Sequence, residues 1–361
     1  MSFAVILAAG VNVGGVAHAA DEVVEAVWKQ GGQRRGEPVA FVRPTGGGHP
    51  VGMLALSGKK VLRIYSGDGS RDYSVSDFQI SGNRVEYIGS ESLPCLEEAE
   101  LFPESNNGNA IGWYKDGKKY LLYAPGAFLP ERQLCFDYQT DETWSPAPPE
   151  DQSALLPKLQ EKLKAGKPVS LAILGDSISA GSDAFREPPY FTRLADMLGH
   201  KTGSTVSVTN HSKGGESTPY GVAQAASVAA EKPDLVIIGF GMNDGSASLK
   251  AEDFSQNIHS IISTIRRDSP ETEFVIINGM TPNPDWNLSN PEIRETYPKA
   301  LQRLKGKGVA VCDVRTTWTF LVDRKGFWSL TGNGVNHPND FGHKLYADAL
   351  LSCISGEAAK R

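Results

Sequence analysis

From residue 169 onward, short apolar runs alternate with amphipathic segments, and this alternation constrains the fold more than any other feature. Apolar runs of strand length occur at 169–174, 205–209, 235–240, 273–278 and 309–314. Helical patterns follow at 190–198, 254–267, 293–304 and 341–352. Continuous apolar strands separated by helices are typical of a parallel sheet covered on both faces. We therefore expect an α/β domain over residues 169–356.

Residues 21–145 have a different periodicity, with short alternating segments separated by turn residues. Segments at 61–65 and 84–88 are of this kind, and Asp116-Gly117 is a strong hairpin signal between 113–115 and 119–123. We expect a smaller β-sandwich or jelly-roll-like domain here. The Pro-rich passage at 146–149 and a polar helical segment predict a linker and lead-in helix over 146–168.

The first residues have the composition of an export signal. Residues 3–16 are small or apolar, and Ala17-His18-Ala19-Ala20 is a pattern that signal peptidase cleaves, although no Lys or Arg precedes the apolar run. This predicts a signal peptide over 1–20 and a secreted or periplasmic protein, the alternative being a cytosolic protein with an apolar start. No later stretch approaches the ~20 apolar residues of a membrane span.

Charge and cysteine content bound the partners and cofactors. The formal charge of −6 and the lack of a basic cluster argue against nucleic acid as a partner. Cys95 and Cys135, or Cys312 and Cys353, could each close a disulfide in an oxidising compartment, or remain as buried thiols. No CxxC motif or His/Cys cluster is present, so we expect neither a metal nor another cofactor.

The ends of three predicted strands are chemically unusual. The first strand is followed by Gly175-Asp176-Ser177, the second by residues 210–215 and the third by residues 241–244. In a doubly wound sheet, ligands bind beyond the carboxyl ends of the strands. These segments therefore predict a site at one edge of the sheet.

The residue types at this edge suit acyl transfer. Ser177 is a candidate nucleophile, and His337, on a loop before the last helix, is the candidate base. The backbone N–H groups of Ser177 and Gly215 and the amide of Asn243 are candidates for an oxyanion hole.

These four blocks, closing with His337-Pro338, resemble the signature blocks of the SGNH (GDSL-type) hydrolases in identity, order and separation. The resemblance implies a flavodoxin-like three-layer α/β/α fold and the roles given above for Ser177, Gly215, Asn243 and His337. Family members commonly carry Asp three residues before the histidine, where this chain has Gly334. We expect a Ser-His dyad with the imidazole held by a backbone carbonyl. A remote carboxylate such as Asp285, or a slow or inactive enzyme, are the alternatives.

A β-domain ahead of such a domain resembles two-domain carbohydrate esterases. This implies hydrolysis of a short-chain ester, an O-acetyl group on a carbohydrate, and the tryptophans Trp113, Trp144 and Trp286 could stack on sugar rings. The alternatives are a lipid esterase, lysophospholipase or thioesterase, and a non-catalytic polysaccharide-binding protein on a decayed hydrolase fold.

Overall fold

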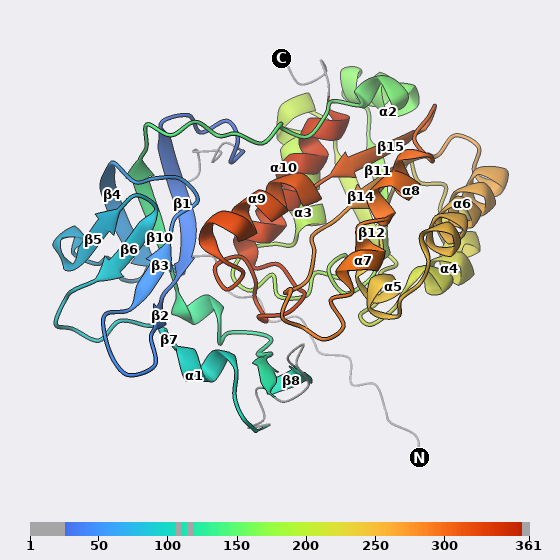
Figure 1. Cartoon of the computed structure of the whole chain (residues 1–361). Helices are drawn as coiled ribbons and strands as arrows, with labels where there is room; N and C mark the ends of the chain where they lie inside the picture. The colour runs from blue at the N-terminus through green and yellow to red at the C-terminus, as the bar shows by residue number, and fades with distance from the viewer. Residues whose placement is uncertain (1–25, 106–109, 114–118, 356–361) are drawn as a thin grey trace, which may run out of the picture.

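The computed structural model describes residues 26–105, 110–113 and 119–355 of the 361-residue chain. It contains a smaller β-rich domain and a larger α/β domain, joined by an extended connection (Figure 1). The predicted signal peptide and the tip of the predicted 116–117 hairpin lie outside the described residues. No helix within the described residues is long and apolar enough to cross a membrane.

The second domain is built on a five-stranded parallel sheet in the order β12-β11-β13-β14-β15. Its strands are β11 (Val169–Gly175), β12 (Val206–Asn210), β13 (Leu235–Gly239), β14 (Glu273–Asn278) and β15 (Val309–Asp313). This is the flavodoxin-like order, in which the chain changes direction across the sheet between the first and third strands. The predicted fold class of the α/β domain is confirmed.

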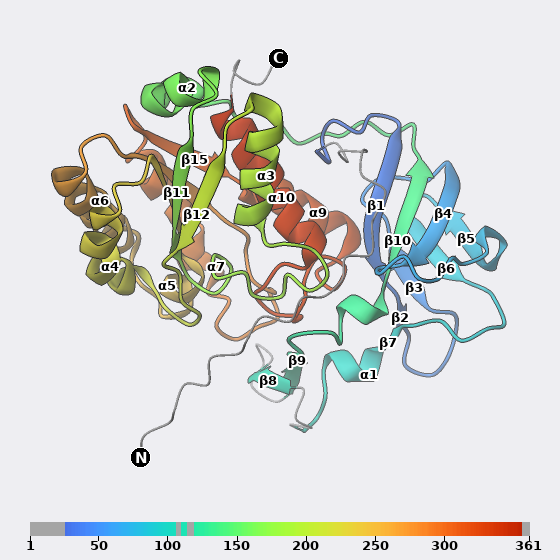
Figure 2. The same ribbon diagram turned by 180° about the vertical axis from the view of Figure 1, so that it is seen from behind.

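Helices cover both faces of this sheet (Figures 1 and 2). One face carries α2 (Pro157–Lys164), α3 (Tyr190–Thr202), α9 (Arg315–Lys325) and α10 (Asp340–Ile354). The opposite face carries α4 (Thr218–Ala230), α6 (Ala251–Asp268) and α8 (Tyr297–Gln302). A hydrophobic core lies on each face of the sheet, and the side chains of β11 alternate between them. Leu171 and Ile173 lie in one core, and Ala172 and Leu174 lie in the other. The continuous apolar run of β11 therefore reflects burial on both sides.

The first domain packs two small sheets face to face. A three-stranded sheet has the order β1-β10-β4 and a five-stranded sheet the order β5-β6-β3-β2-β7. Phe136 of the first sheet meets Phe78 of the second edge to face, with ring centroids 5.7 Å apart. The bounds are β1 (Gln33–Ala40), β2 (Val42–Arg43), β3 (Val51–Met53), β4 (Lys60–Ser66), β5 (Phe78–Ser81), β6 (Arg84–Tyr87), β7 (Leu96–Glu97) and β10 (Gln133–Gln139).

The predicted hairpin is present as a third, two-stranded sheet. Strands β8 (Ala110–Trp113) and β9 (Tyr120–Leu122) pair antiparallel, with Trp113 opposite Tyr120. The remaining short elements are α1 (Glu98–Leu101), α5 (Met242–Ser246), α7 (Pro291–Arg294), η1 (Val75–Asp77), η2 (Pro130–Arg132) and η3 (Ser153–Leu155).

One predicted helix is interrupted. The pattern at 293–304 forms two helices, α7 and α8, because Pro298 lacks a backbone N–H and lies in the first turn of the second one.

The cysteines are not paired in this structure. All four are free thiols, with Cys312 and Cys353 buried in the second domain.

Candidate active site

Ser177 lies in a tight turn directly after β11. The Asp176 carboxylate accepts the N–H of Ile178 at 3.0 Å, and the Asp176 carbonyl accepts the N–H of Ala180 at 2.9 Å. Gly175 is required because a Cβ there would lie 2.4 Å from the carbonyl oxygen of Gly239 on the adjacent strand β13. The turn therefore holds the Ser177 hydroxyl at the carboxyl edge of the sheet.

His337 is brought to Ser177 by a loop that Asn333 organises. The Asn333 side-chain oxygen accepts the N–H groups of Val335, Asn336 and His337 at 2.9, 3.0 and 3.2 Å. The Nε2 atom of His337 then lies 2.8 Å from the Ser177 Oγ. The two predicted residues are thus within hydrogen-bond distance although 160 positions separate them in the chain.

The other imidazole nitrogen contacts a carboxylate that the sequence analysis did not identify. Asp183 Oδ2 lies 2.7 Å from His337 Nδ1, and the Asp183 side chain is 5% exposed. The expectation that a backbone carbonyl orients His337 is therefore wrong. The alternative of a carboxylate from elsewhere in the chain holds, but the residue is Asp183 and not Asp285. Asp183 has a φ of 61°, in the left-handed region that aspartate tolerates better than most residues.

The usual position of the acid has no room for a side chain in this protein. Gly334 has a φ of 84°, and a Cβ there would lie 2.8 Å from the carbonyl oxygen of Leu122 and 2.7 Å from the Trp328 ring. The carboxylate that contacts His337 instead comes from Asp183, in the turn that carries Ser177. The available signal was a carboxylate six residues after the nucleophile, within the same sheet-edge loop.

The two remaining predicted residues lie on neighbouring loops of the same edge. Gly215 has a φ of 80°, which favours glycine. The Asn243 amide donates to the Glu216 carbonyl at 2.7 Å and retains a second N–H. This bond joins the loop after β12 to the loop after β13. The oxyanion role of Ser177, Gly215 and Asn243 stays a prediction.

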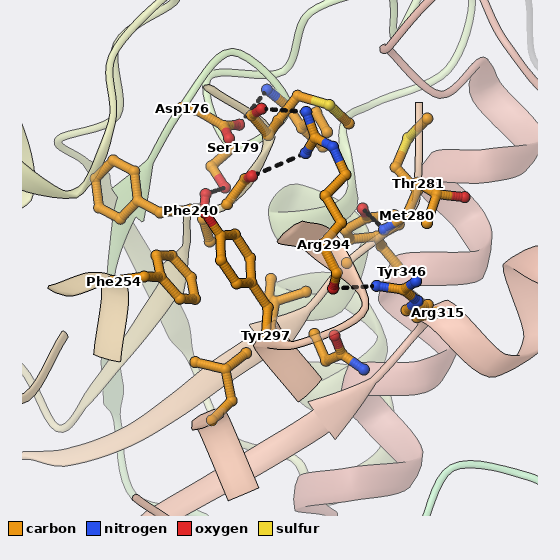
Figure 3. Close-up of a pocket in the computed structure, with 18 residues that line it drawn as sticks. Asp176, Ser179, Phe240, Phe254, Met280, Thr281, Arg294, Tyr297, Arg315 and Tyr346 are labelled. Atoms are coloured by element: carbon orange, nitrogen blue, oxygen red, sulfur yellow. Dashed lines mark hydrogen bonds between the residues drawn. The ribbon is translucent and has the colours of Figure 1, made fainter. Parts of the chain in front are cut away.

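A buried arginine supports the loop that carries Asn243. Arg294, 5% exposed, donates to the carbonyls of Gly241 at 2.9 Å and Met242 at 2.8 Å. Arg294, Asp176, Ser179 and Tyr297 line a cavity of about 50 Å³. Figure 3 shows the Arg294 side chain among these residues. Burial lowers the pKa of Arg294 to about 10 and raises that of Asp176 to about 7. Sequence reasoning missed Arg294, since nothing in its local pattern distinguishes it.

The tryptophans differ in their surroundings. Trp144 packs against Phe320 of α9, with ring centroids 4.8 Å apart, and so fills the interface between the domains. This packing favours a structural role for Trp144 over stacking on a sugar. Trp286 is half-buried, and its backbone N–H donates to the Asn283 carbonyl. The side-chain amide of Asn283 in turn donates to the Gly334 carbonyl at 3.0 Å. The Trp113 side chain lies outside the described residues.

Two further features concern possible metal ligands and a second histidine near the site. Within the described residues there is no group of three or more His, Cys, Asp or Glu side chains that could hold a metal ion. His343 is fully buried in α10, and its Nε2 lies 3.0 Å from the Ser182 carbonyl oxygen.

The fold and this geometry define a doubly wound α/β domain with a serine, a histidine and an aspartate in contact at the carboxyl edge of its sheet. Residues 173–345 of the second domain match the model of the GDSL-like lipase/acylhydrolase family. The matched segment includes Ser177, Asp183, Gly215, Asn243 and His337, and the first domain lies outside it.

Similar proteins include an arylesterase from Vibrio mimicus, 36% identical over 130 residues. The match covers 36% of this chain and 64% of the arylesterase, so less than two thirds of that relative is spanned. A two-domain esterase active on acetylated mannans is 20% identical, with a TM-score of 0.47 over 59% of this chain and 55% of that chain. A catalytic mutant of an acetylxylan esterase from Geobacillus stearothermophilus is 16% identical, with a TM-score of 0.47 over 54% of this chain and 98% of that chain.

Proposed function

We propose that this protein is a serine esterase that hydrolyses short-chain acyl esters, with O-acetyl groups on carbohydrates as the natural substrate class. One observation carries the proposal: Ser177 Oγ, His337 and Asp183 form a continuous chain of contacts at 2.8 and 2.7 Å. The match to the acylhydrolase family model and the similarity to an arylesterase support ester chemistry.

The geometry accounts for both halves of the reaction. His337 Nε2 takes the Ser177 proton while Oγ bonds to the ester carbonyl carbon, and the same proton then passes to the departing alcohol oxygen as the C–O bond breaks. Water attacks the acyl-serine, His337 accepts its proton and returns it to Oγ, and the free acid leaves. The Asp183 carboxylate, in contact with His337 Nδ1, fixes the tautomer of the neutral imidazole and stabilises the positive charge of the protonated ring.

The charge that develops on the carbonyl oxygen is met by fixed dipoles. The N–H groups of Ser177 and Gly215 and the remaining Asn243 N–H lie on the loops that follow β11, β12 and β13. Because hydrogen bonds within the protein already hold these loops, the donors need no reorganisation during the reaction. No metal or organic cofactor enters this scheme.

Polar side chains on the segments that carry the site residues support a hydroxylated substrate. Glu216, whose carbonyl holds Asn243, forms an ion pair with Lys213 at 2.6 Å, and half-buried Asn336 precedes His337. Such groups can bind sugar hydroxyls, and Trp286 on the neighbouring segment offers an aromatic face. We propose export to the periplasm or outside the cell on the basis of the first 20 residues.

Hydrolysis of p-nitrophenyl acetate, butyrate and octanoate by wild type and Ser177→Ala tests the activity. We expect the acetate rate to exceed the octanoate rate and to fall at least about 10³-fold in the variant, because the nucleophile is lost. Ser260→Ala, on α6 and away from the site, serves as the matched control. Release of acetate from acetylated xylan or mannan then tests the substrate class.

Three other results are informative. A preference for octanoate would replace the short-chain proposal with a lipid esterase or thioesterase. Hydrolysis of p-nitrophenyl acetate without release of acetate from acetylated polysaccharides would refute the carbohydrate assignment. Equal rates for wild type and Ser177→Ala on every ester would overturn the proposed catalysis and favour a non-catalytic binding protein.

A further inference from the structure

The second oxygen of the Asp183 carboxylate is held by the first domain. Oδ2 contacts His337, whereas Oδ1 accepts the backbone N–H of Gly126 at 2.9 Å. Gly126 lies in the turn that follows β9 and has a φ of 88°. The carboxylate is therefore clamped between an imidazole of one domain and a backbone amide of the other.

The same part of the first domain contacts the loop that carries His337. We call residues 122–133 the docking segment. Its Ala124 N–H donates to the carbonyl of Asn333 at 3.0 Å, and Asn333 is the residue whose side chain holds the His337 backbone. Gln133 donates to the carbonyls of Trp328 and Thr331 at 2.6 and 3.0 Å. Figures 1 and 2 both show the chain after β9 beside the loops of the second domain.

A buried ion pair fixes the two domains against each other. Lys325, the last residue of α9, lies 2.8 Å from Glu37 of β1, and the two side chains are 0% and 3% exposed. Glu37 also accepts the Tyr138 hydroxyl at 2.9 Å and the Ala55 N–H at 2.6 Å. A buried charge pair with its hydrogen bonds satisfied strongly resists separation of its partners. The docking segment is thus attached to a rigid body.

Resting on the proposed function, we infer that Gly126 is a positioning residue for catalysis and that the first domain completes the active site by orienting Asp183. A carboxylate held at one oxygen only can rotate about its Cβ–Cγ bond, and the Gly126 amide removes this freedom without adding charge. Burial and the Asp183 charge raise the pKa of Tyr123, which agrees with a docking segment lying beside the carboxylate.

Gly126→Ala tests this assignment, with Gly82→Ala as a matched control. Both glycines have positive φ, 88° and 62°, and neither has an atom within 4 Å of an added Cβ, so each variant strains its own turn. Only Gly126→Ala should displace the backbone N–H of residue 126 from the Asp183 carboxylate. We expect kcat on p-nitrophenyl acetate to fall roughly tenfold to a hundredfold in Gly126→Ala with KM nearly unchanged, because a hydrogen bond to a charged group is lost.

Two further measurements separate positioning from loss of structure. In an Asp183→Asn background Gly126→Ala should not lower kcat further, because its effect on kcat depends on the Asp183 carboxylate. The low-field proton resonance of the hydrogen-bonded His337 Nδ1–H should shift or broaden in Gly126→Ala and stay unchanged in Gly82→Ala. Gly126→Asn, which tolerates positive φ better, should show a smaller loss of kcat and provides a folded variant if the alanine variant unfolds.

The inference is overturned if Gly126→Ala and Gly126→Asn, when folded, keep wild-type kcat while Ser177-dependent hydrolysis is intact. Equal losses of kcat in the Asp183→Asn and wild-type backgrounds would also overturn it, because Gly126 would then act independently of the carboxylate. Absence of Ser177-dependent hydrolysis in the wild type is a different outcome and would refute the proposed function itself.

Discussion

At the scale of single residues, a buried neutral histidine supports the turn that supplies the acid. His343 Nε2 lies 3.0 Å from the Ser182 carbonyl oxygen, and its Nδ1 accepts the N–H of Tyr190 at 3.4 Å. This pattern fits the neutral tautomer with the proton on Nε2. Burial lowers the pKa of His343 to about 4, because the charged ring would be desolvated.

This depressed pKa predicts an acid-dependent loss of stability. The unfolded chain takes up a proton on His343 near pH 6.5, whereas the folded chain does so only near pH 4. The free energy of unfolding should therefore fall as the pH drops from 6.5 through 4. In His343→Gln, whose amide can donate to Ser182 but cannot ionise, this fall should be smaller by a few kcal/mol, on the order that linkage gives. Urea unfolding at pH 7 and pH 4.5 measures it.

The exposed His259 on α6 provides the control, since His259→Gln should leave the pH dependence as in the wild type. Identical pH dependence of wild type and His343→Gln would contradict the assignment of a buried neutral ring.

The residues of the candidate site were unequally predictable. Ser177 and His337 lie in short, ordered motifs, so their proximity could be predicted. Asp183 could not, because its role depends on the left-handed turn that it occupies and on the space that Leu122 and Trp328 deny to a side chain at Gly334. The position of Asp183, six residues after Ser177, was the one local signal, but its contact with His337 depends on these long-range features.

At the scale of elements, the break between α7 and α8 has a structural consequence. Arg294 ends α7, and its guanidinium donates to Ser289, Gly241, Met242 and Ser246. The planar fork thereby fixes the start of α5, which carries Asn243. A single amphipathic helix over 293–304 was expected because the periodicity is strong there, but Pro298 lies in the first turn of a second helix.

Arg294→Lys should lower kcat roughly tenfold to a hundredfold, because an ammonium group cannot reproduce the planar set of hydrogen bonds and Asn243 would shift. Arg315→Lys is the matched control, since Arg315 lines the same cavity but bonds to the Arg294 carbonyl and Glu295. Steady-state kinetics on p-nitrophenyl acetate would refute the role of Arg294 if both variants lost activity equally or neither did.

The strands of the α/β domain were predicted to within one residue, because continuous apolar runs bounded by turns leave little choice. Helices α4 and α9 were not predicted. The first is rich in alanine and the second in threonine and aromatic residues, and neither has a clear apolar stripe. Their positions follow from packing on the sheet rather than from local periodicity.

At the scale of the whole molecule, the two domains share a buried, polar interface. The Lys325–Glu37 pair joins residues 288 positions apart, and Arg324 bonds to both the Glu142 carboxylate and the Ala55 carbonyl. Two domains could be predicted from the sequence but no contact between them, since charged residues are normally solvent-exposed. In the folded chain they hold the docking segment beside Asp183.

The most direct test of the account is covalent labelling of Ser177 by a p-nitrophenyl phosphonate ester, followed by intact-protein and peptide mass spectrometry. We predict one phosphonyl group, on Ser177, in the wild type and none in Ser177→Ala. Asp183→Asn should react at least about a hundredfold more slowly, because its imidazole no longer has the correct tautomer. Labelling of another residue, or equal rates for wild type and Asp183→Asn, would contradict the assignment of Ser177, His337 and Asp183 as a catalytic unit.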